Sequence, residues 1–236
     1  LHQPERVIIE YNGMWLVSNF EKMQLPKGWG VEQQITCVDG STFQMYMANM
    51  KSIFMDMIKN TDMVIFNRCK KEDPLPTYRR GIKVANQRAE VIFEDEEGEL
   101  GDIFQDEMPF DMNAPVIEIL PEDYGIWFVD AMDHPENYEG KTVKFKARVM
   151  KPRGMGSKFF VPGRTAMTCC ADDTTFLGYV CKSAYAPKLT AGQWVEVTAK
   201  VGIEKRNEYQ GEEGIVLDAE YVEACEPLAD EMVYFN

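Results

Sequence analysis

The stretch Thr142-Val-Lys-Phe-Lys-Ala-Arg-Val-Met150 alternates strictly between polar and apolar side chains. Such alternation is typical of a β-strand with one face in a core and the other in solvent. Four more segments of strand character follow it, at 158–161, 175–181, 194–201 and 213–222. Short strands spaced this closely and separated by glycine turns are typical of a small closed barrel. We therefore predict an OB-like β-barrel in the second half of the chain.

The sequence of the first half of the chain predicts an α+β domain of short hairpins. Residues 6–17 have the character of two short strands around Asn12-Gly13, and residues 31–46 that of two more around Asp39-Gly40. Dipeptides of this kind favour the tight turns of β-hairpins. We expect both segments to pair locally.

One amphipathic helix is expected after these hairpins, because apolar residues recur at helical spacing between Asn49 and Lys59. The acidic, proline-bounded segment 105–115 then separates the two halves. We place the domains at 1–112 and 113–236. The predicted fold class is mainly β with some α.

The chain of 236 residues carries a net charge of −14. A general nucleic-acid binder relies on Lys and Arg to neutralise phosphates, so this charge argues against that class of protein. The charge is unevenly distributed, since residues 141–206 hold 13 basic and 4 acidic side chains, whereas residues 89–140 hold 17 acidic side chains and no Lys or Arg. The basic block either neutralises acidic segments within the fold or meets an acidic partner or ligand.

No run of eighteen apolar residues is present, so we expect no membrane span in this sequence. The sequence begins at Leu1 without an initiator methionine. We therefore expect a mature or trimmed product.

A segment between two predicted strands concentrates the chemistry of this sequence. It holds three of the six cysteines, Cys169, Cys170 and Cys181, together with Asp172 and Asp173. Thiolates and carboxylates together suit zinc or another borderline divalent cation. Because adjacent residues of a strand point to opposite faces, one ion would take one of the adjacent cysteines, one aspartate and Cys181.

Two other interpretations of this segment remain open. A disulfide from Cys181 to one of the adjacent cysteines would staple the hairpin. Alternatively the thiols are free and structural, and the two aspartates cap a turn and pair with Arg164.

The motif Arg-x-x-Met-Thr-Cys-Cys-x-x-Asp at 164–173, with Gly178-Tyr-Val-Cys181 and Gly192-Gln-Trp-Val-Glu-Val197, resembles the C-terminal soluble domain of the YcgQ-like bacterial proteins. The resemblance covers residues 116–236. It implies an accessory of membrane transport on the extracytoplasmic face of the bacterial membrane, with a YcgR-like integral membrane permease as partner. In that family membrane helices usually precede the domain, and this sequence has none.

The resemblance also carries over site residues, position by position. Those that match the family are Arg164, Met167, Cys169, Cys170, Asp172, Asp173 and Cys181. Of these, we expect the first two to contact a ligand and the cysteines and aspartates to hold the metal ion.

We expect a non-enzymatic binding domain. Nucleophilic catalysis by cysteine needs a histidine base, and the chain has two histidines in all. One alternative is an OB-type binder of single-stranded nucleic acid with Phe159, Phe160, Tyr179 and Trp194 as stacking platforms. Another alternative is a thiol redox protein.

Overall fold

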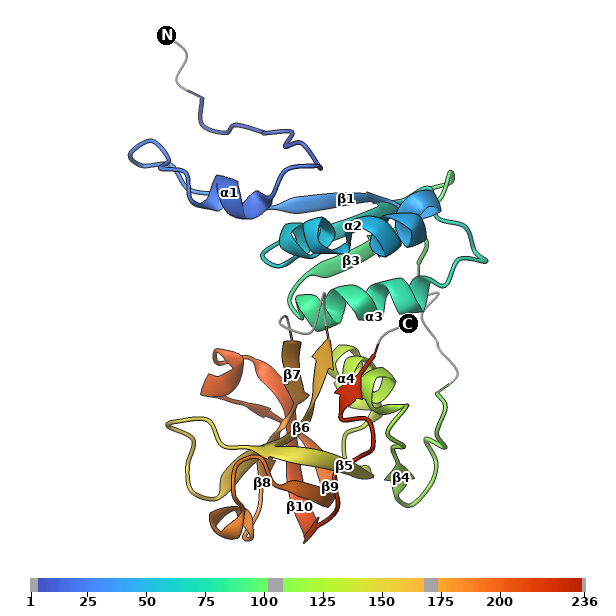
Figure 1. The fold of residues 1–236 in the computed structure, drawn as a ribbon, viewed down its shortest axis with the longest axis vertical. Coiled ribbons are helices and arrows are strands. Elements are labelled where there is room, and N and C mark those ends of the chain that lie inside the picture. Colours follow the sequence, from blue (N-terminus) through green and yellow to red (C-terminus); the bar gives the residue numbers. More distant parts are fainter. Residues whose placement is uncertain (1–3, 102–107, 168–173, 235–236) are drawn as a thin grey trace. The chain divides into compact units, whose positions relative to one another are not determined.

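The structure, a computed structural model, describes residues 4–101, 108–167 and 174–234 (Figure 1). Its fold class is mainly β with some α, as the sequence predicts. The chain forms two compact units, an N-terminal α+β unit and a second unit built around a β-barrel. Among the described residues, no helix is both long enough and apolar enough to cross a membrane.

The two units are not simple halves of the sequence. The first unit consists of Leu1–Asp73 and Ala85–Ile103, and the second of Pro74–Val84 and Phe104–Asn236. Helix α3 (Leu75–Ala85) therefore belongs to the barrel unit except for its last residue, although its sequence interrupts that of the first unit.

The first unit contains a parallel sheet of three strands in the order β1-β2-β3. Its elements are α1 (Val17–Glu21), β1 (Ile35–Asp39), the 3-10 turn η1 (Gly40–Thr42), α2 (Phe43–Ile58), β2 (Met63–Asn67) and β3 (Glu90–Phe93). Ile35 lies opposite Met63, which in turn lies opposite Glu90. The predicted amphipathic helix is confirmed as α2, and it begins six residues before the expected start.

One face of this sheet forms the core of the first unit. Val38, Val64 and Phe66 on that face are buried. Phe43, at the start of α2, packs edge-on against Phe66 with ring centroids 4.9 Å apart. Burial of aromatic and β-branched side chains between a helix and a sheet is the main stabilising contribution here.

The predicted N-terminal hairpins are wrong. Asn12 does start a turn, since Trp15 N donates to Asn12 O at 3.0 Å, but no strand is assigned between residues 4 and 34. At the second site Asp39 ends β1, and its carboxylate accepts a hydrogen bond from Ser41 N at 3.1 Å. Asp39 thereby caps the helical segment that follows, because the residue types that form turns also satisfy the first N–H groups of a helix.

The second unit is a closed barrel of five strands. Its strands are β5 (Thr142–Met150), β6 (Phe159–Met167), β8 (Val180–Lys182), β9 (Trp194–Lys205) and β10 (Glu213–Ala224). They follow one another in the order β5-β9-β10-β8-β6, and pairing of β6 with β5 closes the ring. The five strand segments predicted from the sequence are confirmed, with the one at 175–181 divided into β7 (Thr174–Gly178) and β8.

Shorter elements complete this unit. They are β4 (Ile117–Glu118), α4 (Tyr124–Asp133), η2 (Pro135–Asn137), η3 (Ala186–Lys188), η4 (Asn207–Tyr209) and β11 (Met232–Val233). Strand β4 pairs with β5, and β11 pairs with β6.

Helix α4 supplies large side chains to the barrel core. The Trp127 ring lies 4.8 Å from that of Phe145 and 5.7 Å from that of Tyr179, measured between centroids. The hydroxyl of Tyr124 donates to Leu177 O at 3.0 Å. Side chains therefore fill the barrel, as expected of a barrel with so few strands.

Some of the basic block is neutralised within this unit. Lys144 Nζ lies 3.0 Å from a carboxylate oxygen of Glu196. Arg206 Nη2 lies 3.0 Å from a carboxylate oxygen of Glu208. For these residues the structure favours neutralisation within the fold over contact with an acidic partner.

Candidate binding site at the β6–β7 connection

A pair of glycines holds β6 and β7 close together. Gly163 lies opposite Gly178 in the antiparallel ladder. A Cβ atom on Gly163 would lie 2.5 Å from the Phe176 ring, and one on Gly178 would lie 2.6 Å from Pro162 O. Any other residue at either position would force the two strands apart.

The cysteine–aspartate segment connects these two strands. Strand β6 ends at Met167, whose side chain is half-buried and which lies opposite Thr174, the first residue of β7. Four of the predicted metal ligands lie in the connection, outside the described residues: Cys169, Cys170, Asp172 and Asp173.

Cys181 lies far along the barrel from Met167, the last residue of β6. It belongs to β8, where it pairs with Phe160 at the opposite end of β6 from Met167. Seven residues of an extended strand span about 20 Å. The described residues therefore separate Cys181 from Met167, and its roles as a metal ligand and as a disulfide partner stay predictions.

Burial also limits the chemistry of Cys181. Its side chain is wholly buried in the barrel core. Burial raises the pKa of the Cys181 thiol well above its usual value, with a smaller contribution from Asp218. A protonated, inaccessible thiol is a poor nucleophile, so this residue does not favour the redox interpretation.

Arg164 links three segments of the barrel unit. Its side chain is buried, and its guanidinium donates to Pro121 O, to Asp230 O at 3.1 Å and to Met232 O at 2.9 Å. It also lies 5.6 Å from the centroid of the Tyr124 ring. Desolvation lowers the pKa of this guanidinium. These contacts give Arg164 a structural role, and its ligand-binding role stays a prediction.

The aromatic platforms of the nucleic-acid alternative are mostly in the core. Phe160, Tyr179 and Trp194 are buried. Phe159 is half-buried, and the guanidinium of Arg206 lies 4.4 Å from its ring centroid. Stacking on unpaired bases needs exposed ring faces, which three of these four rings do not present.

The described part of the chain holds no cluster of three or more His, Cys, Asp or Glu side chains arranged for a metal ion. Its cysteines are unpaired, with Cys69 and Cys181 buried, Cys225 half-buried and Cys37 exposed.

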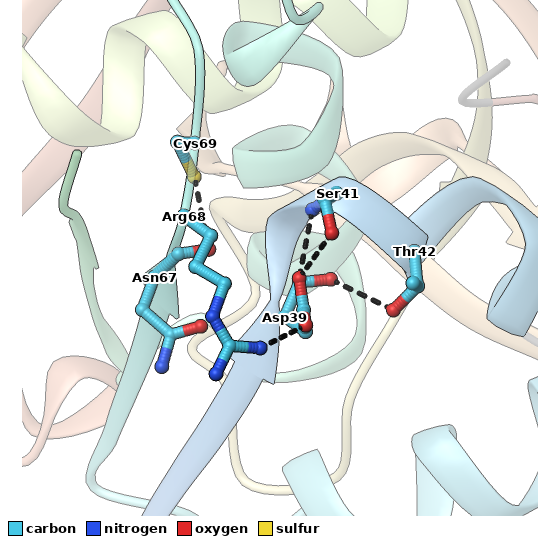
Figure 2. A network of polar contacts seen from close by, with 6 residues as sticks. All are labelled: Asp39, Ser41, Thr42, Asn67, Arg68 and Cys69. Carbon is cyan, nitrogen blue, oxygen red and sulfur yellow. Dashed lines mark hydrogen bonds and ion pairs between the residues drawn. The ribbon is translucent and has the colours of Figure 1, made fainter. Parts of the chain in front are cut away.

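The structure brings together a second cluster of polar residues, which the sequence analysis did not predict. It lies where two adjacent parallel strands end, β1 at Asp39 and β2 at Asn67 (Figure 2). Arg68 forms an ion pair with Asp39, and Ser41 Oγ donates to the Asp39 carboxylate at 2.6 Å. The carboxyl ends of parallel strands are a common place for ligands in α/β proteins.

The groups of this cluster largely satisfy one another. The hydrogen bond from Ser41, with a smaller contribution from Arg68, lowers the pKa of Asp39. Gly40 has no room for a side chain, because a Cβ there would lie 2.7 Å from Cys69 Sγ. Burial raises the pKa of the Cys69 thiol to about 11. The cluster therefore acts as a helix cap, and Asp39-Gly-Ser-Thr42 is the sequence signal that identifies it.

The barrel unit matches the model of a known protein family. Residues 99–235, more than half of the chain, match the family model of the DUF1980 C-terminal domain. The chain belongs to this family. The match contains every strand of the barrel and the cysteine–aspartate connection. No curated protein matches the chain.

Several solved structures have partial likeness to this DUF1980 chain. The mitochondrial single-stranded DNA binding protein Rim1 of S. cerevisiae is 10% identical to this chain. The alignment covers 37% of this chain and 97% of Rim1, with a TM-score of 0.23. Aspartyl-tRNA synthetase of Entamoeba histolytica is 16% identical to this chain. The alignment covers 50% of this chain and 27% of the synthetase, with a TM-score of 0.26. Likenesses of this strength carry no argument about the function of the DUF1980 domain.

Proposed function

We propose that the barrel unit is a non-catalytic binding domain that serves a membrane transport system. Its ligand is a borderline divalent cation such as zinc. The proposed ligands are the thiols and carboxylates of the β6–β7 connection: Cys169, Cys170, Asp172 and Asp173. The resemblance to YcgQ-like proteins supports an integral membrane permease as the partner of the domain.

The pairing of Met167 with Thr174 carries this proposal. Directly opposed residues of an antiparallel pair lie about 5 Å apart, so the connection starts and finishes at nearly the same point. Two thiols and two carboxylates are thereby confined to one short segment. Mixed sulfur and oxygen ligands favour zinc over magnesium or calcium, which prefer oxygen alone.

The filled barrel core supports binding outside the barrel. Trp127, Phe145 and Tyr179 occupy the interior. The hydroxyl of Tyr179 is already used, since it donates to Phe128 O. A ligand therefore has to bind on loops or on outer faces, as the connection between β6 and β7 allows.

Metal analysis of the purified chain tests the proposal. The chain is loaded with zinc or cobalt, desalted and analysed for bound metal, with the cobalt–thiolate absorption as a second readout. We expect one equivalent in the wild type and loss of both signals in Cys169→Ser/Cys170→Ser. Cys37→Ser is the matched control, because it removes an exposed thiol elsewhere and leaves binding unchanged.

Two results contradict the proposal. One is a wild-type chain that retains no metal after desalting. The other is a double variant that keeps the full equivalent, which would place the ion elsewhere. Asp172→Asn/Asp173→Asn then distinguishes a mixed thiol–carboxylate site, where affinity falls while the thiolate absorption remains, from a site made by thiols alone.

A further inference from the structure

The N-terminal arm, residues 4–34, exposes an unusual amount of apolar surface. Of the seventeen large apolar side chains that the structure exposes, ten belong to residues 7–35. Ile8 is 98% exposed, Trp15 60% and Val31 61%. Single exposed apolar side chains are ordinary on a protein surface, whereas their concentration in one stretch of the chain is typical of an interaction site.

The middle of the arm is hydrogen-bonded to its own unit. Ser18 N donates to a carboxylate oxygen of Asp56 in α2 at 3.0 Å. The hydroxyl of Tyr46, also in α2, donates to Gly13 O at 3.1 Å. Residues 5–10, by contrast, make no hydrogen bond to any described residue. The arm thus holds an anchored portion and a leading segment that extends beyond it (Figure 1).

The leading segment has strand character but no strand to pair with. Arg6-Val-Ile-Ile-Glu-Tyr11 contains three consecutive β-branched residues, which favour extended backbone. In the described part of the chain its backbone joins no sheet. An apolar extended segment with open hydrogen-bonding groups readily joins a sheet edge.

The same unit carries an open sheet edge. Strand β1 lies at one end of the order β1-β2-β3 and pairs, among the described residues, with β2 alone. Ile35 and Cys37 on this edge strand are exposed. Every second residue of an edge strand directs its backbone N–H and C=O groups outward, where another strand can bind them.

We propose that two copies of the chain associate by exchanging their leading segments. Residues 6–11 of each copy add as a strand to the open edge of β1 in the other copy. Each chain carries both the donor segment and the acceptor edge, so a reciprocal exchange between two copies satisfies both segments and both edges and closes as a twofold dimer.

The apolar character and the charge of the arm favour a second copy as the occupant. The donor segment exposes Val7, Ile8 and Ile9, and the acceptor strand exposes Ile35, so both partners of the exchange present apolar side chains. The arm carries Glu5, Glu10, Glu21 and Glu32 against Arg6, Lys22 and Lys27. A segment of such balanced charge lacks the basic excess that draws a protein to an anionic membrane surface.

The mass of the chain in solution tests the exchange. Light scattering or sedimentation over a range of concentrations is expected to give twice the chain mass of 27.1 kDa. Since each copy carries a charge of −14, added salt is expected to strengthen the association by screening repulsion. The variant Ile8→Glu/Ile9→Glu is expected to give the single-chain mass. Both side chains are exposed, so this change leaves the fold intact.

A matched control changes an exposed side chain outside the arm. Tyr221, in β10, is 63% exposed, and Tyr221→Glu is expected to leave the dimer unchanged. A wild-type chain that stays a monomer at every concentration overturns the proposal, as does a dimer that Ile8→Glu/Ile9→Glu leaves intact. Sedimentation of a monomeric wild type with anionic vesicles, lost in the double variant, would identify a membrane surface as the occupant instead.

A disulfide trap shows where the segment binds. Cys37 already lies on β1, so Ile8→Cys or Ile9→Cys places a second thiol on the proposed donor strand. Oxidation with diamide is expected to give a covalent dimer on a non-reducing gel, and Cys37→Ser in the same background is expected to abolish it. A cross-linked product of single-chain mass would show that the arm folds onto its own β1, against the proposal. None of these readouts depends on the proposed metal site.

Discussion

The hydroxyl of Tyr138 donates a hydrogen bond to Oδ2 of Asp130 at 2.6 Å. Tyr138 is completely buried, and Asp130 belongs to α4, so this bond fixes the chain that follows the helix against it. Burial, with a further contribution from the hydrogen bond to Asp130, raises the pKa of the phenol well above its usual value. The phenol is therefore a permanent donor at physiological pH.

We predict that Tyr138→Phe lowers the free energy of unfolding of the barrel unit by about 1.5–3 kcal/mol, the usual contribution of a hydrogen bond to a charged group. The ring still fills its site, so the loss of stability measures the contribution of the hydroxyl group and its hydrogen bond. Urea unfolding followed by circular dichroism gives the value. Tyr221→Phe, on an exposed residue, is the control and is expected to have no effect.

Two glycine substitutions are predicted to have opposite effects. Gly163→Ala forces a Cβ into the Phe176 ring and the β7 backbone, so we expect a loss of about 2 kcal/mol or more. Gly81→Ala lies within α3, where nothing comes within 4 Å of a Cβ, and the better helix propensity of alanine is expected to add about 0.5–1 kcal/mol. Thermal melting of both variants checks the signs, and equal effects would contradict the assigned packing.

The first unit is predicted to lose stability in acid through Asp39. The hydrogen bond from Ser41 lowers the pKa of this carboxyl below its usual value of 3.8. The unfolded chain therefore takes up the proton first, so the stabilisation is complete above about pH 4 and is lost as the pH falls through the folded-state pKa.

Unfolding measured between pH 7 and pH 3 tests this dependence. Asp39→Asn is expected to be less stable than the wild type at neutral pH and to show a weaker decline in acid. Ser41→Ala is expected to fall between the two. Glu96→Gln, on an exposed turn, serves as the control for a simple change of net charge. An unchanged acid profile in Asp39→Asn would contradict the assignment.

Thiol reactivity is predicted to follow burial. Cys37 is exposed, whereas Cys69 is buried with a pKa raised to about 11, and Cys181 is buried with its pKa raised further. In a Cys169→Ser/Cys170→Ser background, we expect one fast-reacting thiol with a disulfide reagent near pH 8, and a slower reaction at the half-buried Cys225, whose pKa is raised by burial. The fast signal should disappear in Cys37→Ser, while Cys69 and Cys181 react after unfolding. A fast reaction of Cys181 in the folded chain would restore the redox interpretation.

The barrel could be predicted from the sequence because its signal is local. Each strand such as Thr142–Met150 carries its own alternation, and five of them in a row imply a closed sheet. The parallel sheet could not be predicted in the same way. Asp39-Gly40 has the same local appearance in a hairpin turn and in a helix cap, and only the packing of Phe43 on Phe66 favours the cap.

For the candidate site the sequence predicts a chemistry without a geometry. The residue types at positions 169–173 suit a divalent cation, and the metal site that they suggest stays a prediction. The place of Cys181 depends on its pairing with Phe160, a residue 21 positions earlier, and no local pattern specifies that register. The same limit explains the free segment at residues 6–11, where strand character in the sequence comes without a partner strand in the described part of the chain.

Arg164 also has a consequence for the order of folding. Its guanidinium loses its hydration water when three backbone carbonyl groups accept its hydrogen bonds instead. These carbonyl groups belong to residues 43, 66 and 68 positions away in the sequence. Closing such long loops is slow, and a charge buried before its acceptors arrive is costly. We therefore expect desolvation of Arg164 to be a late step, after the barrel strands have paired. On this expectation the kinetic effect of Arg164 falls on the unfolding rate, so that this residue governs how long the closed barrel persists rather than how fast it forms.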